Sequence, residues 1–248
     1  MKILKLTLTV FLLTSVSLSL FAQAKKTSVQ KSPVKLKVIK TAAPSLKKEE
    51  NPGTSKVKIT TDLGVIIVRL YDSTPKHRDN FLKLVTDHFY DSLIFHRVIS
   101  SFMIQGGDPM SKNASPEEML GMGGGDMSRI PAEFNNKLIH KKGVLAAARD
   151  GNPEKASSAC QFYIVQGKPF TDDELNMIEM QKGFKYTPAQ RNLYKTIGGT
   201  PFLDMEYTVF GEVVSGLDVV DKIAAVQKGP NDRPVKDVRM KMEVLKNK

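Results

Sequence analysis

One short stretch of this sequence places an arginine and a glutamine among large apolar residues, and its residue types could do chemistry. It covers residues 95–109 and reads FHRVISSFMIQGGDP. Its apolar runs predict two short strands, and a period of two puts Met103 and Gln105 on one face of the second. Arg97 would then be either paired within the structure or exposed at the floor of a pocket. The stretch therefore predicts a mostly apolar pocket with two hydrogen-bonding groups, Arg97 and Gln105.

The chain from residue 56 onward predicts many strands and few helices. Polar and apolar residues alternate in 56–61, and a β-rich run follows in 65–71, which indicates a hairpin. One helix is expected to begin at Thr74-Pro75, with Thr74 as the N-cap, and another to cover 217–223. This rhythm suggests an antiparallel barrel or sandwich. The further strands are expected at 95–99, 102–105, 143–148, 161–165, 207–213 and 235–245.

Residues 168–200 do not fit the rhythm of strands. Thr171 and Glu174 have the spacing of a capping box, and Gly183 is placed as a helix-ending glycine. Thr187-Pro188 repeats the start signal. We therefore expect a helical hairpin inserted between two strands. The apolar residues Leu175, Ile178 and Met180 follow the first capping box.

The positive charge of the chain is concentrated at its N-terminus. The net charge is +11, but the first 56 residues hold eleven lysines against two glutamates, so they carry +9 and the remaining residues +2. Such a nearly neutral body argues against a domain that follows a phosphate backbone. Residues 25–55 contain lysines and three prolines but no aromatic residue. They indicate either a flexible tether or a basic arm for an anionic surface.

The first residues have the three parts of a secretory signal peptide. Lys2 and Lys5 precede sixteen uncharged residues, 6–21, and Ala22-Gln23-Ala24 is a small-residue cleavage site. The alternative is a transmembrane anchor, but the stretch is short and small residues follow it at once. We expect a cleaved leader of residues 1–24, export to the periplasm or secretion, and no stable membrane insertion after cleavage.

Several kinds of site are disfavoured by composition. Cys160 is the only cysteine, so it cannot form an intramolecular disulfide or a multi-cysteine metal site, and we expect it in the core. The four histidines lack metal-ligand spacing. The glycine-rich run 121–126 is not followed by the Gly-Lys-Ser/Thr of a phosphate loop. We therefore expect no metal and no cofactor.

Residues 95–108 resemble the signature strand pair of the cyclophilin-type peptidyl-prolyl cis–trans isomerases. The resemblance extends over about 57–246. It implies a mainly β domain, 56–248, built as a closed eight-stranded antiparallel barrel capped by two α-helices, with the hairpin as an insertion. It also implies isomerisation of X-Pro bonds in exported proteins, which assists their folding. Proline-containing polypeptides are the expected partners, without nucleic acid, and we expect a monomer. The similar segments are 143–148, 158–164, 202–204 and 207–213.

Position by position, the resemblance implies catalytic roles for Arg97 and Gln105. Because the reaction needs no proton transfer, we interpret His96 as a structural hydrogen-bonding residue. Substrate contacts are implied for Phe102, Met103, Ala148, Gln161, Tyr163, Phe202, Leu203 and Tyr207. The sequence departs from the family's best-known members at Tyr163 (usually Phe), Phe202 (Trp), Tyr207 (His) and Arg149 (Asn).

Two other functions remain open. One is a prolyl-peptide-binding or chaperone-like module with weak catalysis, although intact Arg97, Phe102, Met103 and Gln105 favour turnover. The other is an exported protein that binds nucleic acid or a surface through the basic segment 25–55.

Overall fold

The computed structural model describes residues 55–246. The expected signal peptide and all of the expected linker except Ser55 lie outside the described residues. Within 55–246, no helix combines the length and the apolar character needed to cross a bilayer.

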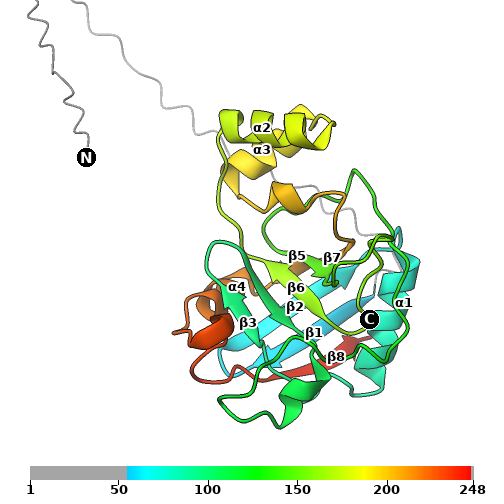
Figure 1. Cartoon of the computed structure of the whole chain (residues 1–248), viewed down its shortest axis with the longest axis vertical. Coiled ribbons are helices and arrows are strands. Elements are labelled where there is room, and N and C mark those ends of the chain that lie inside the picture. Colours follow the sequence, from blue (N-terminus) through cyan, green and yellow to red (C-terminus); the bar gives the residue numbers. More distant parts are fainter. Residues whose placement is uncertain (1–54, 247–248) are drawn as a thin grey trace, which may run out of the picture. The chain divides into compact units, whose positions relative to one another are not determined.

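An eight-stranded antiparallel sheet forms the body of the protein (Figure 1). Every neighbouring pair of strands is antiparallel, in the order β3-β4-β6-β5-β7-β2-β1-β8. The predicted strands are all present, although the last begins at Met240 rather than 235. The strands are β1 (Lys56–Thr61), β2 (Gly64–Leu70), β3 (Arg97–Ile99), β4 (Met103–Gly106), β5 (Val144–Ala147), β6 (Phe162–Val165), β7 (Val209–Ser215) and β8 (Met240–Leu245).

The sheet is curled but open, which corrects the expectation of a closed barrel. In the described part of the chain, no strand ladder joins the edge strands β3 and β8. Among the described residues, the segment just before β3 reaches the other edge through an isolated bridge between Ile94 and Arg239 and through three backbone hydrogen bonds. These join Ser92 N to Met240 O (2.9 Å), Met240 N to Leu93 O (2.8 Å) and Phe95 N to Val238 O (3.0 Å). Because β3 is three residues long, it offers too little backbone for a full ladder.

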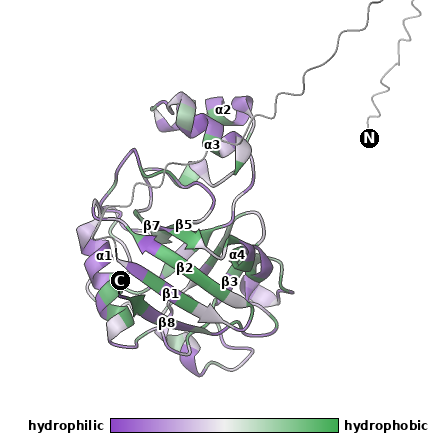
Figure 2. Ribbon diagram, turned by 180° about the vertical axis from the view of Figure 1, so that it is seen from behind, coloured by the Kyte–Doolittle hydropathy of each residue, from purple (hydrophilic) through white to green (hydrophobic). Residues whose placement is uncertain are grey.

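The core lies between the curled sheet and two helices, α1 (Pro75–Thr86) and α4 (Leu217–Ala224). Alternate residues of β1 and β2 are fully buried, among them Val57 and Ile66. The ring of Phe81 on α1 packs edge-on against Phe162 of β6 at 5.6 Å. Figure 2 shows apolar residues along much of the sheet and on α4, whereas α1 is more polar. The expected burial of Cys160 is confirmed.

The start of α1 is confirmed, but its cap is not the predicted one. Thr74 occupies the N-cap position, yet its hydroxyl donates to Tyr71 O at 3.4 Å and makes no cap bond. The carboxylate of Glu133 accepts instead from the amides of Lys76 (3.1 Å) and His77 (3.0 Å). It also lies 2.7 Å from His77 Nδ1. A residue from a distant loop therefore satisfies the free amides of the first turn.

The inserted hairpin consists of α2 (Asp172–Lys182) and α3 (Pro188–Thr196), beyond the end of the sheet near β5 and β7 (Figure 1). Both capping boxes are present, and Gly183 ends α2 with a φ of 73°. Leu175 is fully buried, whereas Met180 is exposed. Three short 3₁₀ helices complete the elements: Pro109–Lys112, Pro201–Leu203 and Pro230–Asp232.

The two ends of the insertion lie next to each other. Lys168 and Gly199 form an antiparallel bridge, and Gly199 N donates to Lys168 O at 3.0 Å. Gly199 has no room for a side chain, because a Cβ atom would lie 2.2 Å from His140 O. The hairpin therefore leaves and rejoins the body at one place.

We predict that Glu133→Gln lowers the free energy of unfolding by about 2 kcal/mol, because an amide cannot accept from all of these donors. Burial alone would raise the pKa of Glu133, but hydrogen bonds from His77 and the two amides outweigh it and lower the pKa. The contribution of Glu133 is therefore present at neutral pH and lost as the pH falls below about 4.5. Urea unfolding at pH 7 measures the change. The exposed Glu154→Gln is the control, and an equal loss in both variants would contradict the assignment.

Candidate active site

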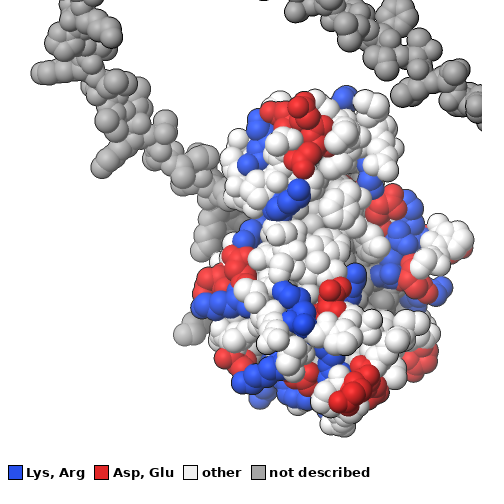
Figure 3. All heavy atoms as spheres, turned by 60° about the vertical axis from the view of Figure 1, so that its left-hand side comes forward, with Lys and Arg blue, Asp and Glu red and all other residues white. Residues whose placement is uncertain are grey.

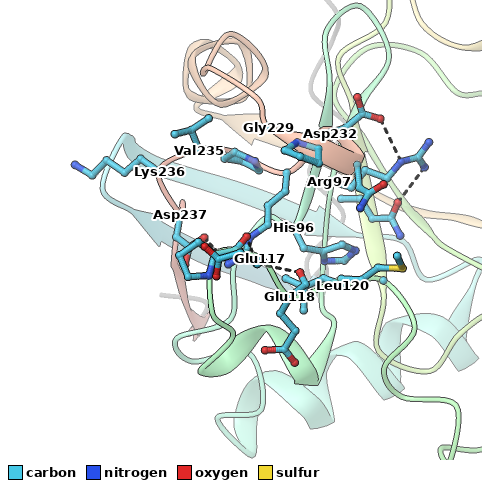
Figure 4. A pocket seen from close by; sticks show the side chains of 18 of the residues that line it. His96, Arg97, Glu117, Glu118, Leu120, Gly229, Asp232, Val235, Lys236 and Asp237 are labelled. Carbon is cyan, nitrogen blue, oxygen red and sulfur yellow. Dashed lines mark hydrogen bonds and ion pairs between the residues drawn. The ribbon is translucent and has the colours of Figure 1, made fainter.

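Arg97 is the first residue of β3, and the ladder to β4 places it directly opposite Gln105. Its side chain is 45% exposed. The guanidinium makes only long contacts in the described part of the chain: Nη1 lies 3.5 Å from Gln105 Oε1, and Nε lies 3.8 Å from Asp232 Oδ2 (Figure 4). The sequence left two alternatives for Arg97, pairing within the structure or exposure at a pocket. The exposed side chain and its long contacts favour the second. Its donors remain available to a ligand.

A chain of amides orients Gln105. Its Nε2 donates to Gln161 Oε1 at 3.1 Å. Gln161 Nε2 in turn donates to the carbonyls of Gly121 (3.0 Å) and Gly123 (2.9 Å). Because both amide protons of Gln161 are used in this way, its oxygen faces Gln105, and the oxygen of Gln105 then faces Arg97.

The glycine-rich loop therefore belongs to the site, a role that the sequence did not predict. Its backbone is held by Asp108, which accepts from Gly121 N at 2.5 Å. A Cβ atom on Gly123 would lie 2.0 Å from Asp108 Oδ1, so a larger residue would displace the loop. The run of glycines was the signal in the sequence that could have indicated this role. The carbonyls of the loop are used by Gln161, which directly precedes β6, and this contact forms only in the folded protein.

A wall of apolar side chains lies beside the polar residues Arg97, Gln105 and Gln161. Met103 on β4 and Tyr163 on β6 are buried within it, and Tyr163 lies opposite Gln105 in the ladder. The Phe202 ring is 44% exposed and lies 5.7 Å from the ring of Phe102. The structure thus brings the predicted substrate-contacting residues together. The members of the wall from that set are Phe102, Met103, Ala148, Tyr163, Leu203 and Tyr207.

Arg149 lies at the edge of this wall. Its guanidinium carbon is 4.7 Å from the centre of the Tyr207 ring, and its Nε donates to Glu206 O at 2.9 Å. A cation over an aromatic face is a favourable contact. The side chain therefore stabilises Tyr207 in the wall.

A cavity of about 1220 Å³ opens beside Arg97. Two loops, 116–122 and 229–237, line most of it (Figure 4). Gln105 of β4 lines it as well. None of the wall residues lines this cavity. Arg97 and Gln105 therefore line this cavity, and Gln105 also lies next to Tyr163 of the apolar wall. Within 55–246, no group of three His, Cys, Asp or Glu side chains is placed to hold a metal ion.

His96 does not have the structural hydrogen-bonding role that we predicted. It is 3% exposed, and neither ring nitrogen has a hydrogen-bond partner in the described residues. Burial lowers the pKa of His96 to about 4; the charge of Asp108 opposes this shift, while Arg97 and Arg233 reinforce it. His96 is therefore a neutral packing residue behind Arg97.

Comparison with known proteins identifies the family. Residues 56–244 match the family described as "Cyclophilin type peptidyl-prolyl cis-trans isomerase/CLD". A Staphylococcus aureus protein named "Putative peptidyl-prolyl cis-trans isomerase" is 34% identical over 196 residues, which is 79% of this chain and 93% of that protein. A Streptococcus pyogenes "Putative bifunctional phosphatase/peptidyl-prolyl cis-trans isomerase" is 38% identical, but the match covers only 38% of it.

Solved structures agree on the fold. A cyclophilin type peptidyl-prolyl cis-trans isomerase of Cryptosporidium parvum covers 79% of this chain and 99% of its own, with a TM-score of 0.59 and 23% identity. A second structure of that protein, in the presence of the dipeptide Ala-Pro, has a TM-score of 0.55 and 22% identity. The chain belongs to the cyclophilin-type peptidyl-prolyl cis–trans isomerases, and its activity is the isomerisation of the bond before proline.

We predict that His96→Leu removes part of the pH dependence of stability. In the unfolded chain His96 takes up a proton near pH 6.5, but in the folded protein only near pH 4. The stability that neutral His96 contributes is therefore complete above pH 6.5 and is lost, by up to about 3 kcal/mol, as the pH falls to 4.

Urea unfolding at pH 7, 5.5 and 4.5 tests this. His96→Leu should flatten the decline, whereas His88→Asn, at an exposed histidine, should keep the wild-type slope. Parallel slopes for wild type and His96→Leu would contradict the assignment of a depressed pKa to His96.

Proposed function

We propose that Arg97 is the catalytic residue of an isomerase that acts on exported proteins and assists their folding. The observation that carries this proposal is the placement of Arg97. It lies opposite Gln105, half-exposed, with two long contacts, and lines an open cavity. Hydrogen-bond donors in such a position are available to a substrate.

The reaction needs little from the protein. The barrier to rotation about a peptide bond, about 18–20 kcal/mol, comes from C–N resonance. When the X-Pro bond twists, resonance is lost and the prolyl nitrogen regains a lone pair. Arg97 can donate a hydrogen bond to that nitrogen, and the bond is stronger in the twisted state than in the planar one. This difference in binding lowers the barrier.

The remaining residues hold the substrate during the twist. Met103, Phe102 and Leu203 would bind the proline ring by apolar contact, with Tyr163 beneath it. Gln105, oriented by Gln161, would donate the second hydrogen of its Nε2 to a neighbouring carbonyl of the substrate. The Ala-Pro dipeptide present in the Cryptosporidium structure supports a substrate of this kind. No bond is broken, so the mechanism uses no nucleophile.

We predict that Arg97→Ala lowers kcat/KM about 100-fold, because one donor aimed at developing charge contributes roughly that factor. Arg97→Lys should recover only part of it, because a single ammonium lacks the planar fork of donors. The measurement is a proline-isomerisation assay on residues 25–248. Arg78→Ala, on α1, is the control and should keep wild-type turnover. Turnover of Arg97→Ala within threefold of wild type would reject the mechanism.

The second candidate is a prolyl-peptide-binding module with weak catalysis. The exposed Phe202 ring and the wall behind it would suit such a role. The same variants separate the two functions. If Arg97→Ala loses turnover but still binds an X-Pro peptide, the catalytic role holds. If wild type binds the peptide without turnover, the binding module is correct.

The place of action follows from the N-terminal residues. A leader of residues 1–24 would direct the chain to the periplasm or outside the cell, and residues 25–55 would tether the domain. On the face shown in Figure 3, acidic and basic side chains of the domain are interspersed rather than gathered by sign. A body of this kind suits uncharged prolyl peptides better than nucleic acid.

We predict that expression with the native leader yields a mature protein that begins at Lys25. Ala22→Phe with Ala24→Phe should block cleavage, because the processing site requires small residues. Ala42→Phe, within the tether, should be processed normally. Mass spectrometry of the exported fraction provides the measurement, and an intact N-terminus in wild type would contradict the signal peptide.

A further inference from the structure

A single buried carboxylate joins the inserted hairpin to the sheet. Asp204 is 3% exposed and accepts hydrogen bonds on both oxygens. Its Oδ1 lies 2.7 Å from His140 N and 2.8 Å from His140 Nδ1. Its Oδ2 lies 2.7 Å from Tyr186 Oη and 2.5 Å from Tyr194 Oη. Four donors from two separate segments therefore converge on one side chain.

With a neutral His140 ring, the donors and acceptors of this group fit one arrangement. An ionised carboxylate can only accept, so His140 Nδ1 carries a hydrogen and donates it to Asp204. In a neutral ring, Nε2 is then an acceptor. It lies 3.1 Å from Tyr163 Oη, which has no other hydrogen-bond partner among the described residues. Tyr163 therefore donates to His140, and His140 donates to Asp204.

The tyrosine hydroxyls keep their protons. Burial, and after it the neighbouring charge of Asp204, raises the pKa of Tyr186 and of Tyr194. Burial is also the main cause that raises the pKa of Tyr163. All three hydroxyls therefore keep a proton that they can donate.

The two ends of the chain lie in different parts of the protein. Tyr186 joins α2 to α3, Tyr194 lies on α3, and both belong to the core of the hairpin together with Leu175 and Ile139. Tyr163 belongs to the apolar wall beside Gln105. The hairpin is therefore connected to the wall through side chains as well as through the backbone.

We propose that the inserted hairpin fixes the Tyr163 ring within the proline-binding wall through the chain Tyr194–Asp204–His140–Tyr163. These residues are positioning residues, because none of them donates to the twisting bond. The inference rests on the proposed role of the wall in binding proline. A ring held by a hydrogen bond at its far end has one orientation, and a binding surface that is fixed in advance binds its ligand more tightly.

The chain should affect binding more than the chemical step. The wall contacts the proline ring equally in the planar and the twisted state, whereas Arg97 acts on the twisted state alone. Loss of the chain should therefore raise KM and leave kcat nearly unchanged. Mutations along a coupled network change such quantities by about three- to tenfold.

A double-mutant cycle in the full mature protein tests the coupling. We expect Tyr194→Phe and Tyr163→Phe each to raise KM about three- to tenfold, with kcat within about twofold of wild type. Because both remove the same chain, the double variant should be no worse than either single variant. Additive effects on KM, or an unchanged KM in Tyr194→Phe, would overturn the proposal. If Tyr194→Phe does not fold, Tyr186→Phe takes its place in the cycle.

The matched control is Tyr90→Phe. Its hydroxyl is also buried and donates to Cys160 O at 3.1 Å, but its ring belongs to the core under the sheet rather than to the wall. This variant should lose stability without a change in KM. If Tyr90→Phe raises KM equally, the effect of Tyr194→Phe is a general loss of packing, and the proposed chain is rejected.

A readout without turnover separates this proposal from the proposed function. The chain has six tyrosines, so 3-fluorotyrosine labelling gives six fluorine resonances. The resonance that Tyr163→Phe removes should shift in Tyr194→Phe and stay in place in Tyr90→Phe. If the chemical shift of this resonance is unchanged in Tyr194→Phe, the coupling is overturned even when the enzyme is active. Absence of turnover in wild type rejects the catalytic assignment, and the resonance still decides the coupling.

Discussion

The pairing of β4 with its two neighbours determines the relative position of the site's parts. Arg97 lies opposite Gln105 across the first ladder, and Gln105 lies opposite Tyr163 across the second. A guanidinium, an amide and an aromatic ring are thus placed in one row by backbone hydrogen bonds. A slip of one residue in either ladder would turn its side chains to the other face of the sheet. The arrangement depends on strand register, which resists thermal motion better than a loop does.

Two charged groups in this protein have opposite environments. Arg97 is half-exposed and makes only long contacts, so its donors remain free to bind a substrate. Asp204 is buried and accepts from four donors, so its polar atoms are satisfied within the interior. The first charge is available because its side-chain contacts, to Gln105 and Asp232, are long. The second is saturated, so it serves to hold neighbouring segments in place. Arg97 is therefore the charge available for catalysis, and Asp204 is the charge that holds the surrounding segments in place.

Local patterns were predicted well from the sequence, and contacts between distant segments were not. The capping box that begins at Thr171 was found because its residues lie within one turn of helix. The cap of α1 was missed because its acceptor, Glu133, is far along the chain from Thr74. Resemblance to the family assigned the residues that the structure brings together around Arg97. It could not show the link between Asp204 and the hairpin, because that link forms only when side chains from separate segments meet in the folded protein. The closed barrel was implied by the family resemblance, whereas the structure has a curled, open sheet whose edge strand β3 is three residues long.

The bridge between Lys168 and Gly199 has a consequence for how such an insertion can arise. The ends of the hairpin are held together by the body itself, so the entropy of closing this loop is already paid by contacts outside it. The cost of a longer or shorter segment between fixed ends grows only with the logarithm of its length. The strands on either side, β6 and β7, need not change register when the segment varies. The body can therefore accept, enlarge or lose a peripheral module at this point while its sheet remains the same.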